Sequence, residues 1–355
     1  MVDVCSGRDY KHLTEGDIPV YGTGGYMLSV SEALSYDKDA IGIGRKGTID
    51  KPYILNAPFW TVDTLFYAIP KEKVDLNFAF AIFQNINWKK KDESTGVPSL
   101  SRTAINEIHI LVPQYDEQQA LGQLFYGIDR LITLHQRKLD KMKELKKTFL
   151  NLIFSQKLRF RGFTDSWELR KLGEITEKIT RKNQSLESLL PLTISAQHGL
   201  IDQNSFFNKQ IASKDVSGYY LIKNGEFAYN KSYSNAYPWG AIKRLDLHDK
   251  GVLSTLYIVF KPTNVESNFL VSYYSADNWH KEVSIRAAEG ARNHGLLNIS
   301  PQDFFETKLL IPNKYEEQEK IGVFFKKLDN LIIFNQDKIN RLKNVKKILL
   351  RNMLI

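Results

Sequence analysis

Two long stretches of the chain carry apolar residues at the spacing of an amphipathic helix. In residues 113–157, one apolar row recurs every seven positions and a second lies three residues after it, which is the heptad pattern of a coiled coil. The first row is Leu121, Ile128, His135, Met142 and Phe149. The second row is Leu124, Leu131, Leu145 and Leu152. A third row makes the predicted stripe wider than a bare helix pair needs: Phe125, Ile132 and Leu139.

Residues 313–355 repeat this pattern 200 positions later. Between residues 115–153 and 315–353, 14 of 39 aligned positions are identical, which is far beyond shared composition. The matching first row is Ile321, Leu328, Asn335, Leu342 and Leu349. Each helix thus has one polar residue at the same heptad position. In an antiparallel pair, His135 and Asn335 could face each other and fix the register, or each could lie at a partly wet edge.

The block before each helix has a different character. Residues 1–112 contain short aromatic and β-branched runs separated by Gly, Pro and Asp, which predict strands. These runs are 18–21, 40–43, 59–62 and 108–112. A linker at 158–166 leads into a second block, 167–312, whose first predicted strand begins at Trp167. The predicted fold class is α+β, with two mixed strand-rich domains separated by two long helices that pair as an antiparallel coiled coil with pseudo-two-fold symmetry.

Composition narrows the classes of partner and compartment. The 355 residues include 49 Lys and Arg against 40 Asp and Glu, a net charge of +9, which favours a polyanionic partner without requiring one. The single cysteine allows no disulfide framework, and the seven histidines form no ligand-spaced cluster. No apolar run approaches the roughly 18 to 20 residues that cross a bilayer, and no signal-peptide pattern is present. We expect a cytoplasmic protein without a metal site.

Two motifs suggest chemistry only weakly. Residues 21–25, Tyr-Gly-Thr-Gly-Gly, have the glycines of a phosphate loop but neither its spacing nor its Lys-Ser/Thr, and a tight turn is the alternative. Residues 56–60 and 235–239 resemble the Asn-Pro-Pro-aromatic motif with which amino-methyltransferases hold a flipped base, without its consecutive prolines. No convincing S-adenosylmethionine loop accompanies them, so we predict no catalytic residue on this chain.

Basic and polar loop residues are the candidate DNA contacts. Arg45 and Lys46 lie on a glycine-flanked loop with Thr48, where Arg could bind a guanine edge and Lys a phosphate, or both could be solvated charges. The corresponding stretch of the second block offers an amide and rings that suit adenine edges and base packing, although Trp239 could belong to the core. Its candidates are Tyr229, Asn230, Lys231 and Trp239. Two further sets could line the same groove: Ser99, Ser101 and Arg102, and Arg292, Asn293 and His294.

Together these residues resemble the specificity subunit of a type I restriction-modification enzyme. The likeness rests on residues 167–175, the Gly-Arg-Lys-Gly-Thr-Ile loop at 44–49, residues 96–101, and the proline exit into each Glu-Gln-x-x-(Leu/Ile)-Gly helix start. It covers essentially the whole chain. The resemblance implies two target-recognition domains, each binding half of a split site in double-stranded DNA, on a non-catalytic subunit. It also implies two modification (methyltransferase) subunits docked on the helices and two restriction (motor-nuclease) subunits, with S-adenosylmethionine, ATP and Mg bound by those partners.

The first block departs from that family in one respect. The counterpart of residues 167–171 would fall before Met1, so residues 1–112 should lack their opening strand. A different start, a recombined gene or a truncated copy would each explain this. The alternatives are therefore a partly inactive truncated specificity subunit, a coiled-coil DNA-binding adaptor of another restriction-modification type, and an adaptor that binds protein only. A self-contained restriction-modification enzyme would need sequence that this chain does not contain.

Overall fold

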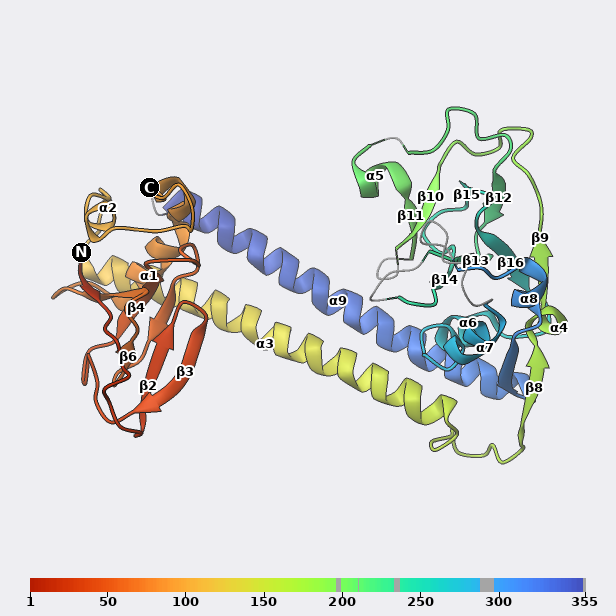
Figure 1. Cartoon of the computed structure of the whole chain (residues 1–355), viewed down its shortest axis with the longest axis horizontal. Helices are drawn as coiled ribbons and strands as arrows, with labels where there is room; N and C mark the ends of the chain where they lie inside the picture. The colour runs from red at the N-terminus through yellow and green to blue at the C-terminus, as the bar shows by residue number, and fades with distance from the viewer. Residues whose placement is uncertain (196–198, 210, 233–236, 288–296, 354–355) are drawn as a thin grey trace. The chain divides into compact units, whose positions relative to one another are not determined.

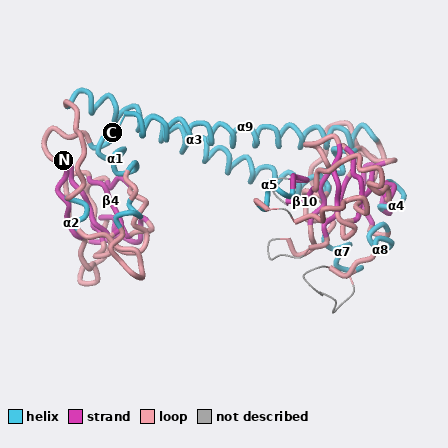
Figure 2. The backbone as a smooth tube through the Cα atoms, turned by 90° about the horizontal axis from the view of Figure 1, so that it is seen from above, coloured by secondary structure: helices cyan, strands magenta, loops and turns pink. Residues whose placement is uncertain are grey.

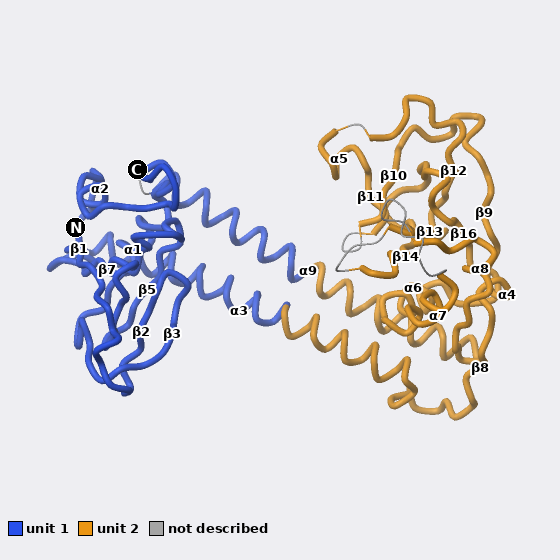
Figure 3. Tube along the Cα trace, in the orientation of Figure 1, with its two compact units in different colours: residues 1–139, 335–355 blue, residues 140–334 orange. Residues whose placement is uncertain are grey.

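A computed structural model describes residues 1–195, 199–209, 211–232, 237–287 and 297–353 (Figure 1). The chain divides into two compact units, Met1–Leu139 with Asn335–Ile355, and Asp140–Phe334 (Figure 3). Each unit combines a strand-rich block with parts of two long helices, and the predicted mixed fold is confirmed. Within the described ranges, no helix is long and apolar enough to cross a membrane. Those ranges also hold no group of three or more His, Cys, Asp or Glu side chains that could bind a metal ion.

The long helices are α3 (Tyr115–Phe154) and α9 (Tyr315–Met353). In the first unit, Lys346 of α9 pairs with Asp129 of α3 at 2.5 Å, and Leu350 shares an apolar cluster with Phe125. Residue numbers therefore increase along α3 in the direction in which they decrease along α9, so the two helices are antiparallel.

The second unit repeats the first unit's ion pair. There Lys146 of α3 contacts Asp329 of α9, also at 2.5 Å. Positions 146 and 346, and 129 and 329, are equivalent in the repeat. The two units thus hold their helices together with the same pair of residues, as the predicted pseudo-two-fold relation requires.

The first unit contains two small sheets. Strands, among them β4, are magenta in Figure 2. One is antiparallel, with strand order β1-β7-β4-β5, and the other has the order β3-β2-β6. The strands are β1 (Val2–Ser6), β2 (Ile18–Gly22), β3 (Gly25–Val30), β4 (Ala40–Gly44), β5 (Tyr53–Leu55), β6 (Trp60–Thr61) and β7 (Leu65–Pro70). The helices are α1 (Leu76–Asn85), the 3-10 helix η1 (Trp88–Lys91) and α2 (Arg102–Asn106). All five residues of β4 are buried, so this strand lies at the centre of the block.

The second unit has a matching four-stranded antiparallel sheet, β14-β13-β16-β9, and three two-stranded sheets, β10-β11, β12-β15 and β17-β8. Its strands are β8 (Trp167–Lys171), β9 (Thr176–Ile179), β10 (Leu192–Ser195), β11 (Gly199–Asp202), β12 (Tyr220–Lys223), β13 (Phe227–Asn230), β14 (Ala241–Arg244), β15 (Lys250–Leu253), β16 (Ile258–Pro262) and β17 (Lys308–Pro312). Its helices are α4 (Leu172–Ile175), α5 (Gln203–Phe207), α6 (Ser267–Tyr273), α7 (His280–Arg286) and α8 (Pro301–Phe305).

The two four-stranded sheets correspond strand for strand. Val2 of β1 lies opposite Pro70 of β7, as Thr176 of β9 lies opposite Pro262 of β16. The first block therefore begins at the equivalent of residue 175. Residues 1–112, all of which the structure describes, contain no counterpart of β8 or α4.

One strand prediction is wrong. The runs 18–21, 40–43 and 59–62 contain β2, β4 and β6, but residues 108–112 form no strand. The counterpart of this segment, β17, pairs with β8 from Lys308 opposite Lys171 to Pro312 opposite Trp167. Because the first block has no equivalent of β8, residues 108–112 have no neighbour with which to form a ladder.

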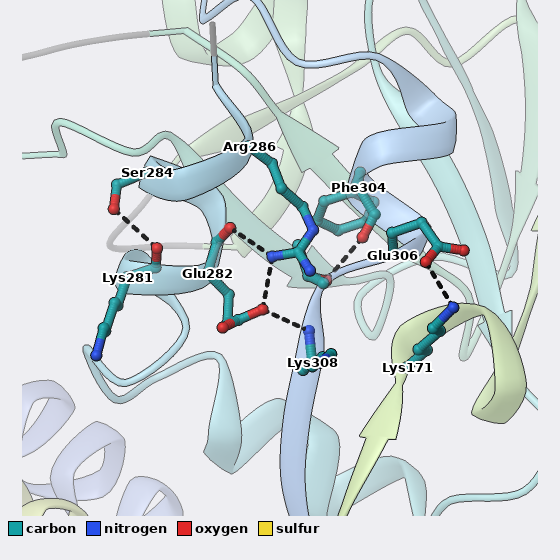
Figure 4. A network of polar contacts seen from close by, with 9 residues as sticks. Lys171, Lys281, Glu282, Ser284, Arg286, Phe304, Glu306 and Lys308 are labelled. Carbon is teal, nitrogen blue, oxygen red and sulfur yellow. Dashed lines mark hydrogen bonds and ion pairs between the residues drawn. The ribbon is translucent and has the colours of Figure 1, made fainter.

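Side chains fix the β8-β17 ribbon at one end (Figure 4). The ammonium of Lys171 contacts Glu306 at 2.8 Å. The carboxylate of Glu282 accepts a hydrogen bond from the backbone N–H of Lys308 at 2.9 Å and another from Arg286 at 2.6 Å. The first N–H of β17 is thereby satisfied from outside the ribbon.

The helix seam uses only part of the predicted apolar stripe. Of the residues predicted to pair the helices, four are buried: Leu121, Ile128, Ile321 and Asn335. The other four are half-buried: His135, Met142, Leu328 and Leu342. The row of Leu124, Leu131 and Leu145 is exposed, whereas Phe125 and Leu139 of the third row are buried. The seam therefore combines the first and third rows.

The helix register does not set His135 opposite Asn335. In the first unit, Phe125 associates with Leu350 and Asp129 with Lys346. From the first association to the second, the position moves four residues forward on α3 and four residues back on α9. Continuing those steps brings His135 level with residue 340, which is roughly 1.4 turns from Asn335. The two polar residues instead occupy equivalent positions on either side of the helix centre.

Candidate nucleic-acid interface

A duplicated glutamine ties each long helix to the block before it. In the second unit, the side chain of Gln318 accepts a hydrogen bond from the backbone N–H of Glu266 at 2.8 Å and donates to the carbonyl of Pro312 at 2.8 Å. Glu266 itself caps α6 by accepting from the N–H of Phe269. A single amide thus joins α9, the end of β17 and the start of α6.

The first unit has the same arrangement. The side chain of Gln118 accepts from the backbone N–H of Asp75 at 3.2 Å and donates to the carbonyl of Pro113 at 2.9 Å. Asp75 caps α1 by accepting from the N–H of Phe78 at 2.8 Å. Aspartate serves here where the second unit uses glutamate.

A glycine one turn later makes this close approach possible. A Cβ on Gly122 would lie 2.2 Å from the Asp75 carboxylate, and one on Gly322 would lie 2.6 Å from the Glu266 carboxylate. We call each set of glutamine, glycine and capping carboxylate the helix clasp. Sequence reasoning did not assign these residues, although their identity across the repeat was the available signal.

In the first unit, the predicted DNA contacts Arg45, Lys46, Thr48 and Ser99 come together. Lys46 forms an isolated antiparallel bridge with Ser99, and the carbonyl of Arg45 accepts from the N–H of Leu100 at 2.9 Å. Arg45 and Lys46 are exposed, while Thr48 and Ser99 are half-buried. The residues form one polar surface at the end of β4.

Glycines shape this loop. A Cβ on Gly44 would lie 2.0 Å from the carbonyl oxygen of Thr48, and Gly47 has a φ of +85°. The loop can therefore fold back tightly only with glycine at these two positions. The guanidinium of Arg45 lies 5.8 Å from the ring of Phe66, which limits its freedom at small cost.

Ser101 and Arg102 stand at the start of α2. The hydroxyl of Ser101 accepts a hydrogen bond from the N–H of Ala104 at 3.0 Å, so Ser101 caps the helix. This capping role explains a serine at the position without any contact to DNA. Ser300 caps α8 in the same way through Asp303. Arg102 is exposed.

In the second unit, Lys231 takes the place of Arg45. Its carbonyl accepts from the N–H of Leu297 at 2.9 Å, and its ammonium donates to the carbonyl of Ile299 at 3.3 Å. Burial lowers the pKa of Lys231 below the usual lysine value. The amide of Asn230 caps a local turn by accepting from the N–H of Ser232.

The two predicted aromatic contacts have structural roles. Tyr229 is fully buried, stacks on Phe304 at 4.7 Å between ring centroids, and donates its hydroxyl proton to the carbonyl of Trp239 at 2.9 Å. A DNA contact by Tyr229 does not fit this position, because its ring lies in the core. Trp239 is half-buried against the same core. Arg292, Asn293 and His294 lie outside the described residues.

The two weak motifs are structural where they are described. Residues 21–25 form the hairpin turn between β2 and β3, with Gly25 at a φ of +107°. Phe59 and Trp60 are buried, and the indole of Trp60 donates to the carbonyl of Arg8. Of the second aromatic motif, residues 235–236 lie outside the described part of the chain.

Comparison with known proteins agrees with this duplicated architecture. The profile of the type I restriction modification DNA specificity domain matches residues 6–144. The second half repeats the same order of block, clasp and long helix. The chain is similar to type I specificity subunits over residues 6–144.

Two curated specificity subunits are similar to parts of the chain. The MjaVIII type I restriction enzyme specificity subunit of Methanocaldococcus jannaschii is 26% identical over 147 residues, 40% of this chain and 33% of that protein. The C-terminal part of a putative type I specificity subunit from Mycoplasma pneumoniae is 23% identical over 148 residues, 42% of this chain and 95% of that protein. The match thus spans a third of the length of the first relative.

A solved structure resembles the whole fold. The type I restriction-modification S subunit from M. genitalium aligns with 100% of this chain and 94% of its own length, with a TM-score of 0.67 and 15% identity. At that identity, the likeness concerns the fold alone.

Proposed function

We propose that this chain gives a type I restriction-modification complex its DNA sequence specificity by binding a bipartite target, one half-site per strand-rich block. The observation that supports this most directly is the equivalence of Arg45 and Lys231. Arg45 directly follows β4 and Lys231 directly follows β13, which are inner strands of their sheets. The backbone carbonyl of each accepts a hydrogen bond from an N–H in the segment just before a serine-capped helix. Two equivalent frames with different loop side chains suit two different half-sites.

We also propose that two modification subunits dock on the long helices, and that two restriction subunits join them. Equivalent apolar side chains are exposed in both copies of the repeat. Leu134 and Phe334 are 51% and 65% exposed, and Leu145 and Val345 are 42% and 48% exposed. Exposed apolar rows of this kind are typical of protein-binding surfaces. Their duplication suits two copies of one partner.

Catalysis and cofactor binding are assigned to the partners. The chain would position the complex on DNA, and the partner subunits would bind S-adenosylmethionine, ATP and Mg. The polar loops described above serve to hold turns and cap helices, which is what a binding scaffold needs.

The deciding experiment is methylome sequencing after co-expression with a type I modification (methyltransferase) subunit. The proposal predicts a bipartite, adenine-methylated motif. Replacing residues 165–312 with those of a relative should change one half-site and leave the other. An unsplit motif would contradict the assignment of one half-site to each block.

A gel-retardation assay addresses the alternative of an adaptor that binds protein only. Purified chain with a modification subunit should retard a duplex that carries the motif, and the retardation should weaken steeply with salt because phosphate contacts release counterions. A complex that forms but retards no duplex would favour the protein-only adaptor.

A further inference from the structure

Residues 108–112 of the first unit have the sequence of a strand but no strand beside them. In β17, their counterpart, Ile311 is 4% exposed, whereas Val112 at the equivalent position is 43% exposed. Within residues 1–139, all of which are described, the N–H groups of residues 109–112 donate to no carbonyl. The segment thus presents an unused ladder edge, which is a template for another chain.

A cavity of about 470 Å³ lies along this edge within the first unit. Its lining comprises Phe78, Ile82, Asn85 and Ile86 of the α1 region, residues 108–113, Glu117, and Asn352 and Met353 at the end of α9. A second cavity, of about 240 Å³, lies on another side of the same segment, and Trp88 contributes to its lining. An apolar groove with one carboxylate therefore borders the free edge.

The second unit shows what fills the corresponding place. There Trp167 begins β8, and its indole N–H donates to Glu317 at 3.4 Å. Arg159 donates two hydrogen bonds to the same carboxylate, at 3.0 and 2.7 Å. The ring of Trp167 packs against that of Phe269, with centroids 6.3 Å apart. An arginine and a tryptophan eight residues later thus bury Glu317, which is 2% exposed.

The residues that receive this pair are present in the first unit. Glu117 is the repeat equivalent of Glu317 and is exposed at the cavity. Phe78 follows its capping Asp75 by three residues, as Phe269 follows Glu266, and it also lines the cavity. The receiving groove is therefore built, and the strand that would occupy it is absent from residues 1–112.

We propose that this groove binds an extended polypeptide segment, which carries an arginine and, eight residues later, a tryptophan that opens a strand. The segment adds antiparallel to residues 109–113, with its tryptophan opposite Pro113 and its fifth strand residue opposite His109. The arginine and the indole N–H bind Glu117, and the indole ring lies beside Phe78. This is β-strand addition with side-chain pockets that supply specificity.

The chemistry of the occupant follows from the groove. A segment that covers the exposed Glu117 would bury its carboxylate, and a buried carboxylate without a partner is costly, so the segment must bring a positive charge. The free N–H groups of residues 109–112 require carbonyls, which a strand supplies at the right spacing. A second copy of this chain is a poorer donor, because its own residues 159–171 are already bound to Glu317 and β17.

The test uses the full chain and a labelled synthetic peptide of residues 157–172, which contains Arg159 and Trp167 at the required spacing. Fluorescence anisotropy should show saturable binding. Hydrogen exchange should slow at the amides of residues 109–112. A peptide with Trp167→Ala, and the chain variant Glu117→Gln, should each weaken binding about tenfold. The matched variant Asp116→Asn, which changes the exposed acidic neighbour outside the cavity, should leave binding unchanged.

Three results would overturn the proposal. They are no saturable binding, equal affinity of Glu117→Gln and the unaltered chain, and exchange protection that appears at β17 instead of residues 109–112. The last would mean that the peptide replaces β8 in the second unit. Thermal unfolding of Glu117→Gln without peptide, compared with Asp116→Asn, separates a misfolded variant from one that has lost only the binding carboxylate.

Discussion

At the residue scale, Gly122 and Gly322 show the clearest steric requirement. A Cβ at either position would overlap the capping carboxylate and the first turn of the short helix that it caps, α1 or α6. Substitution by alanine should push the strand-rich block away from its long helix and destabilise that unit by about 1–3 kcal/mol. Urea denaturation of Gly122→Ala and Gly322→Ala measures this.

Gly127 provides the matched control on the same helix. A Cβ there would meet nothing within 4 Å. Gly127→Ala should therefore stabilise the chain by about 0.5–1 kcal/mol, because alanine favours the helix. Equal effects at positions 122 and 127 would rule out the clasp as the cause.

The loop after β4 leads to a second residue-scale prediction. In a complex with the modification subunit, Lys46→Ala should weaken binding to all DNA sequences similarly and reduce the salt slope by about one unit. Arg45→Ala should instead cost roughly 1–3 kcal/mol at one base pair and relax specificity there. Fluorescence anisotropy with duplexes substituted at each position distinguishes the two effects.

Lys71→Ala serves as control for that experiment, because Lys71 is exposed in the same block and pairs with Asp3. An equal loss of affinity in Lys71→Ala would indicate a general effect of net charge. Specificity that is unchanged in Arg45→Ala would remove Arg45 from the base contacts.

Residue type alone could not separate binding from structural roles. Arg45, Lys46 and Thr48 were predicted on one loop, and Ser99 was predicted in a set that could line the same groove. The Lys46–Ser99 bridge brings the two segments together. Tyr229 was predicted from its place beside a polar loop, but it is the last of three consecutive buried residues of β13, and its ring lies in the core. The face that a strand residue occupies depends on the sheet register, which the sequence of one strand does not reveal.

At the element scale, the helices were predictable and their seam was only partly so. The heptad pattern predicted both helices to within a few residues, and the repeat predicted their equivalence. Three adjacent apolar rows, however, offered two possible seams. The structure pairs the rows of Leu121 and Phe125 and leaves the row of Leu131 exposed. Periodicity records apolar positions without saying which of them face the other helix and which face another protein.

The duplicated ion pair can be tested with a double-mutant cycle. Asp129→Asn and Lys346→Met should be coupled by about 0.2–1 kcal/mol, since both side chains are partly exposed. The cycle of Asp329→Asn and Lys146→Met should give a similar value, because the same repeat positions make the same contact. Urea denaturation measures both. Raising the salt concentration should reduce each coupling.

Lys347→Met, an exposed neighbour on the same helix, is the control for Lys346→Met. It should show no coupling to Asp129→Asn. Coupling confined to one of the two cycles would mean that the pseudo-two-fold relation does not extend to the energetics of the helix pair.

At the scale of the whole molecule, each long helix connects the contacts of one unit with those of the other. α3 passes from the first unit to the second at Leu139, and α9 passes back at Phe334. Two ion pairs between the helices, Asp129 with Lys346 and Lys146 with Asp329, each join residues of one unit. Extra helix inserted at both points would thus leave the interior of each unit unchanged.

Such an insertion tests whether helix length sets the distance between half-sites. Four residues added after Leu139 and four after Phe334 lengthen each helix by about one turn, roughly 6 Å. At about 3.4 Å per base pair, the methylated motif should gain roughly two base pairs of spacer while both half-sites stay the same. Methylome sequencing of the co-expressed complex measures this. Four residues inserted after Gly162, in the linker outside both helices, should leave the spacer unaltered. If the unaltered chain, the chain with lengthened helices and the chain with the linker insertion all gave the same spacer, helix length would not set the distance between the half-sites.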